Sequence, residues 1–87
     1  MKKIVAAAIL FKLTDNEICL MTDRRHSDIF RKAYQLHLEY KASAQGFLTN
    51  DNQFVDRYEA KKIAVAADQL IVPEEDTYAE LYSEDLW

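Results

Sequence analysis

The stretch KIVAAAILFKL, residues 3–13, contains the longest apolar run of the chain, Ile4 to Phe11. In a β-strand, residues at every second position share a face. One face of this stretch would carry Val5, Ala7, Ile9, Phe11 and Leu13, and the other Ile4, Ala6, Ala8 and Leu10. Because both faces are apolar, the pattern predicts a central or interface strand rather than a solvated edge strand.

A hairpin and a helix are expected to follow this strand. The turn residues Asp15-Asn16 precede a second strand over residues 17–22 (EICLMT). Ser27 is a suitable N-cap, and the spacing after it predicts a helix over residues 28–42. The residues at helical spacing are Ile29, Phe30, Ala33, Leu36, His37 and Tyr40.

The second half repeats this order. Residues 44–55 predict a short hairpin around the turn 50–52, with the only glycine, Gly46, at its entry. Asp56 and Glu59 form a capping-box-like pattern before a helix over residues 57–70, which Pro73 is expected to end. The order ββ-α-ββ-α-tail predicts a small single α+β domain with antiparallel hairpins and two helices.

We expect a compact ligand-binding domain over residues 1–73 and an acidic aromatic segment over residues 74–87. Residues 68–87 contain seven acidic residues and no Lys or Arg. Such a run is commonly a solvated tail. The apolar residues within it, which include Leu81 and Trp87, equally favour packing on the domain or on a neighbouring protomer.

Composition excludes several classes of function. The chain has 87 residues and a formal net charge of −4, which argues against binding nucleic acid through counterion release. One cysteine, Cys19, allows neither an intramolecular disulfide nor a thiolate zinc site. The apolar run is too short to span a bilayer. In so small a domain, we expect a ligand pocket to be shared between protomers.

The first candidate site is Arg24-Arg25-His26, which leads into the start of the first helix. Adjacent guanidinium groups and helix N-terminal amides suit an anion such as phosphate. The alternative is a strand end with solvated cations, ion-paired to the acidic tail.

The second candidate site is Phe47 beside Gly46, followed by Asp56 and Arg57. A ring next to a glycine can stack on a base. Alternatively, Phe47 and Phe54 are core residues of the hairpin, Asp56 is a helix cap and Arg57 lies on the surface.

No catalytic or metal-binding motif is recognisable. The two histidines lack the spacing of a metal site, His37 fits a core or interface position, and Cys19 lies in an apolar strand. We therefore expect no enzyme activity, no metal and no cofactor.

Several motifs together resemble a group of small phage and prophage proteins. They are residues 3–8 (KIVAAA), 25–29 (RHSDI), 45–49 (QGFLT), 54–57 (FVDR), 59–60 (EA), 63–64 (IA), 67–69 (ADQ) and 81–87 (LYSEDLW). The chain is similar in this pattern to the first-described Thoeris anti-defence family. It departs from the pattern at Asn52 and Asp68, where glycine is common.

This resemblance implies a phage protein that sequesters a cyclic ADP-ribose-type signal made by host TIR-domain enzymes, without cleaving it. It also implies a homodimer or hexamer with pockets between protomers, acting in the cytoplasm of the infected bacterium; some relatives also hold cyclic dinucleotides. By the resemblance, Phe47 is the stacking ring, Arg24 or Arg25 holds phosphate, and Asp56 with Arg57 contacts ribose or base. The alternative is a protein-interaction module that uses the acidic tail against a basic partner.

Overall fold

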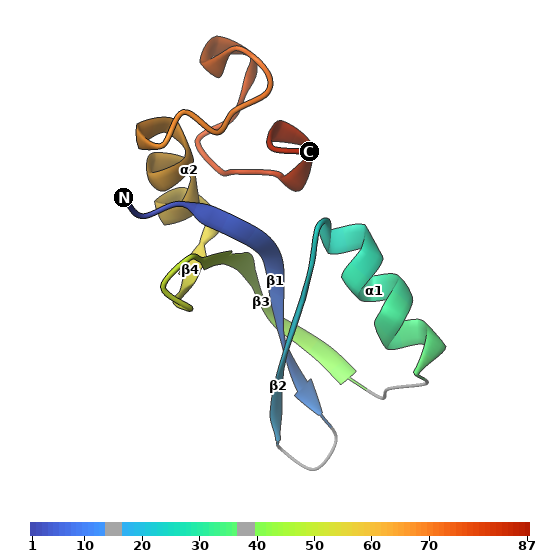
Figure 1. Ribbon diagram of the computed structural model, residues 1–87. Coiled ribbons are helices and arrows are strands. Elements are labelled where there is room, and N and C mark those ends of the chain that lie inside the picture. Colours follow the sequence, from blue (N-terminus) through green and yellow to red (C-terminus); the bar gives the residue numbers. More distant parts are fainter. Residues whose placement is uncertain (14–16, 37–39) are drawn as a thin grey trace.

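The computed structural model describes residues 1–13, 17–36 and 40–87, and it shows an α+β domain (Figure 1). Strands β1 (Ile4–Leu13), β2 (Ile18–Asp23), β3 (Tyr40–Thr49) and β4 (Phe54–Asp56) form one antiparallel sheet in the order β2-β1-β3-β4. Helix α1 (His26–Gln35) follows β2, and helix α2 (Arg57–Ala66) follows β4 directly. The predicted fold class and the central position of the first strand are confirmed.

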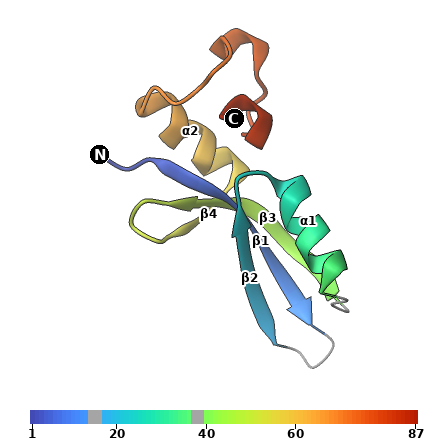
Figure 2. The same cartoon turned by 45° about the vertical axis from the view of Figure 1, so that its right-hand side comes forward.

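The two faces of β1 have different surroundings. Ala7, Ile9 and Phe11 are fully buried on one face, in a core that both helices and the C-terminal segment share. On the other face, Leu10 lies opposite Leu20 of β2, which is 45% exposed. Both helices pack on the side of the sheet that carries this core (Figure 2).

One face assignment in β1 was wrong. Ile4 belongs to the buried core cluster together with Ala7 and Ile9, whereas Val5 is 46% exposed. The pairing with β3 shifts by one residue between Ile4 and Ala6, which marks a β-bulge at Val5. Because a bulge inserts one extra residue, it turns Ile4 onto the face opposite to the one that strict alternation predicts.

The first helix was predicted too long and to start two residues too late, at residue 28 instead of His26. The structure places residues 40–42 in β3, where they pair with residues 11–13 of β1, while the His37 prediction lies outside the described residues. The N-cap is Arg25, which has no side-chain cap bond, and not Ser27. The hydroxyl of Ser83 instead accepts the His26 backbone N–H at 3.4 Å, so a distant segment supplies the missing cap.

The second helix ends before Pro73. Asp68 has a φ of 55°, its N–H donates to the Val65 carbonyl at 3.1 Å, and the Gln69 N–H donates to the Ala64 carbonyl at 2.9 Å. This is a Schellman arrangement, which ends a helix through a left-handed residue. Asn52, in the β3–β4 turn, also has a positive φ of 62°, so both positions where the resembled family has glycine require left-handed backbone.

The C-terminal segment packs on the same domain. Leu81, Ser83 and Leu86 are buried, and Trp87 packs partly against the core. Two 3₁₀ helices, η1 (Glu74–Asp76) and η2 (Ser83–Asp85), shape the segment, and its end lies beside the start of α1 in both views (Figures 1 and 2).

Candidate functional site

Three of the six predicted site residues meet where the start of α1, β3 and the start of α2 converge. His26 begins α1, Phe47 lies in β3 and Arg57 begins α2. The His26 ring meets the Phe47 ring edge-on, with centroids 4.9 Å apart, and the Arg57 guanidinium carbon lies 6.0 Å from the Phe47 centroid. The two sequence motifs therefore form one cluster in space.

His26 is buried and both of its ring nitrogens have partners. Nε2 lies 2.7 Å from the Gly46 carbonyl oxygen, and Nδ1 lies 3.1 Å from Ser83 Oγ. A carbonyl can only accept, so Nε2 carries the proton, and in the neutral ring Nδ1 accepts from the Ser83 hydroxyl. Burial lowers the pKa of His26 below its usual value, despite the Gly46 carbonyl, which favours the charged form.

Phe47 offers no exposed ring face. Its side chain is fully buried in the core, where His26 and Arg57 contact it. In this conformation the ring packs the junction instead of facing a ligand, so the predicted stacking role lacks an accessible surface.

Arg57 connects this cluster to the C-terminal segment. Its Nη1 donates to the Leu81 carbonyl at 2.9 Å, and its Nη2 donates to Gln45 Oε1 at 2.8 Å. The guanidinium carbon also lies 5.0 Å from the centroid of the Tyr82 ring, a cation–π distance. The preceding residue, Asp56, is the predicted N-cap: its carboxylate accepts the Glu59 backbone N–H at 2.7 Å, which confirms that prediction.

Arg24 and Arg25 form the open side of the cluster. Both residues are exposed, and Arg25 Nη2 donates to the backbone oxygen of Trp87. Within the described residues, neither guanidinium pairs with an acidic side chain. They stand immediately before the first turn of the ten-residue α1, whose amide groups carry partial positive charge. This arrangement can hold an anion.

Sequence reasoning missed the contribution of the C-terminal segment to this site. Ser83 binds His26, Leu81 binds Arg57, and Trp87 binds Arg25. The motif LYSEDLW marks this segment in the sequence. However, its residues lie too far along the chain from His26, Arg57 and Arg25 for any local pattern to predict the contacts. Three of the six candidate residues are thus in direct contact with residues 81–87.

Other kinds of site have little support in the described ranges. No group of three or more potential metal ligands occurs there. Each helix in those ranges is also too short or too polar to cross a membrane.

The comparisons with known proteins place the chain in a family. The model of the phage T4 y16D protein family matches residues 3–87, and the chain belongs to this family of phage proteins. Searches of curated proteins and of solved structures gave no match.

Proposed function

We propose that this phage protein is an anti-defence protein that binds and sequesters a cyclic ADP-ribose-type nucleotide signal made by TIR-domain enzymes of the infected bacterium. It acts in the host cytoplasm and releases the nucleotide chemically unchanged. The observation that carries the proposal is the pair of exposed guanidinium groups, Arg24 and Arg25, at the start of α1. Membership of a phage family and the sequence resemblance support the biological setting.

The charge of such a ligand matches this arrangement. A cyclic ADP-ribose-type signal carries two phosphate charges, and two guanidinium groups with helix N-terminal amides offset them. Each charge-assisted hydrogen bond contributes roughly 1.5–3 kcal/mol. A sponge that outcompetes the host effector needs nanomolar affinity, about −12 kcal/mol, so further contacts are required.

Those contacts divide between this protomer and a second one. Asp56 is exposed at the start of α2, whereas His26 and Arg57 support the site through their contacts with Phe47. Since Phe47 is buried, we assign it a supporting role and not base stacking. A second copy, in a dimer or hexamer, would close the site on the open side of Arg24 and Arg25.

The test is capture and release. The purified protein is incubated with the products of a TIR-domain signalling enzyme and is then filtered to remove unbound molecules. Heating releases the bound small molecules, which are identified by mass spectrometry. A parallel experiment uses cyclic dinucleotides in place of these products. We expect an intact cyclic nucleotide from the native protein and at least a tenfold lower yield from the double variant Arg24→Ala/Arg25→Ala. Arg31→Ala, an exposed arginine later in α1, is the matched control and should retain the ligand.

Two results would contradict the proposal. Retention of nothing, under conditions where an established sponge captures its signal, removes this ligand class. Release of a cleaved nucleotide shows an enzyme instead.

A further inference from the structure

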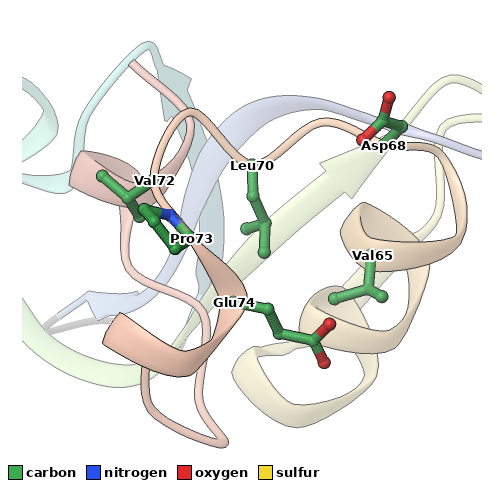
Figure 3. Close-up of a pocket in the computed structure, with 6 residues that line it drawn as sticks. All are labelled: Val65, Asp68, Leu70, Val72, Pro73 and Glu74. Atoms are coloured by element: carbon green, nitrogen blue, oxygen red, sulfur yellow. The ribbon is translucent and has the colours of Figure 1, made fainter.

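A pocket of about 260 Å³ lies beside the C-terminal end of α2, and none of the nucleotide-site candidates lines it (Figure 3). It forms where the left-handed Asp68 ends α2 and the residues that follow, within 70–74, face Val65 of the helix across the pocket. The lining residues are Val65, Asp68, Leu70, Val72, Pro73 and Glu74. Figure 3 shows Leu70 pointing between Val65 and Glu74, with the Glu74 carboxylate beside Val65.

The pocket is lined by aliphatic and acidic residues, and the surface that they expose to it is more polar than apolar. Four of the six lining residues are apolar and two are acidic, and none is basic. Neither Asp68 nor Glu74 forms an ion pair within residues 1–13, 17–36 and 40–87. Beside the pocket, Ile71 is 62% exposed and Val65 is 37% exposed, so apolar surface continues outside it.

The size and charge of the pocket restrict its occupant. Its volume is below the roughly 300–1,000 Å³ of pockets that hold drug-sized ligands. Two carboxylates repel a phosphate, so the nucleotide signal does not fit here. A side chain that ends in a cation suits the mainly polar, acidic lining, and a stem of methylene groups can lie against the smaller aliphatic part.

We propose that this pocket binds a lysine side chain carried by a basic segment of another protein. The lysine methylene groups lie against Val65 and Leu70, and the ammonium group pairs with Glu74. The surrounding charge favours such a partner, because residues 68–87 carry seven acidic side chains and no basic one. The inference goes beyond nucleotide sequestration and gives the protein a second, separate contact with the host.

The test is a titration followed by NMR of the Val65, Leu70 and Val72 methyl groups. The probe is acetyl-Ala-Lys-Ala-amide. The comparison probes are the same tripeptide with norleucine in place of lysine, and n-butylammonium. We expect the lysine peptide alone to shift these methyl signals in a saturable manner. Glu74→Gln should raise its Kd by about fivefold, the upper end of the range for one exposed charge pair.

Glu75→Gln is the matched control, because it removes the same charge one residue along, outside the pocket lining. It should leave the Kd of the lysine peptide within about twofold, since a screened charge at a distance acts weakly. Both variants change exposed residues and should keep the native spectrum elsewhere.

Four results would overturn the inference. Equal shifts with the norleucine peptide would show that the ammonium group is not recognised. Equal binding of n-butylammonium would assign the pocket to a free amine. If Glu74→Gln and Glu75→Gln weakened binding of the lysine peptide equally, the pocket would hold no specific lysine site. The absence of any methyl shift with the lysine peptide would lead to the same conclusion.

Discussion

Gly46→Ala is the substitution whose effect the structure defines most directly. A Cβ at position 46 would lie 2.1 Å from the Val55 carbonyl oxygen and 2.8 Å from Phe54 Cζ. Non-bonded carbon atoms normally lie about 3.5–4.0 Å apart, so β4 would have to retreat by more than about 1 Å. Gly46 has no positive φ, so the close approach of β4, and not backbone conformation, requires glycine here.

The expected cost is at the upper end of the range for overpacking, about 3 kcal/mol. The retreat of β4 would break its three residue pairs with β3 and disturb the Asp56 cap. For a domain of this size each kcal/mol lowers Tm by roughly 4–8 °C, which predicts a fall of about 12–24 °C. Thermal and urea unfolding followed by circular dichroism would measure it.

A double variant identifies the responsible atom. Phe54→Ala removes the aromatic ring but leaves the Val55 carbonyl, so Gly46→Ala should cost nearly as much in the Phe54→Ala background as in the native chain. At an unstrained site Gly→Ala stabilises by about 0.4–1 kcal/mol. A gain of that size, or full rescue by Phe54→Ala, would refute the reasoning.

Three further predictions concern the cluster and the C-terminal segment. Burial lowers the pKa of His26 in the folded protein below its unfolded value of about 6.5. The unfolded state therefore binds more protons than the folded state between these two pKa values. The free energy of unfolding should fall as the pH falls from about 6.5 through the folded pKa. Urea midpoints between about pH 5 and 8 should show this slope, and His26→Gln should flatten it; an unchanged slope in the variant would assign the effect to other groups. Asp56→Ala should cost about 1 kcal/mol in urea unfolding because it removes the α2 cap, whereas Asp56→Asn keeps an accepting oxygen and should cost little; equal losses would contradict the capping role. Leu81→Ala empties a fully buried position and should cost about 2–5 kcal/mol, against under about 1 kcal/mol for the neighbouring, more exposed Tyr82→Leu; a small loss for Leu81→Ala would show that the segment is not part of the core.

Local sequence signals predicted the elements that local physics controls. The alternation in residues 4–13 and the turn after it gave β1 and its hairpin with β2, and Asp56 with Glu59 gave the start of α2. These features depend on neighbouring residues only, so a single sequence is sufficient to predict them.

The errors lie where distant residues or backbone exceptions decide. Residues 40–42 continue a helical spacing, but pairing with β1 places them in a strand. Asp68 adopts the left-handed conformation that ends α2, although the apolar helical spacing continues to Leu70 and predicts a longer helix. The contacts of Ser83 with His26 span 57 residues and cannot be inferred from local spacing.

The distance along the chain between His26 and Ser83 also has a kinetic consequence. Closing a flexible loop of 57 residues costs about 3.6 kcal/mol of chain entropy, before any smaller constant terms. The hairpin of β1 and β2 closes a far shorter loop, so it is expected to form first and residues 81–87 to dock late. Contacts made after the rate-limiting step change the unfolding rate and leave the folding rate nearly constant. The C-terminal segment therefore determines how long each folded molecule persists, while the sheet determines how quickly it forms.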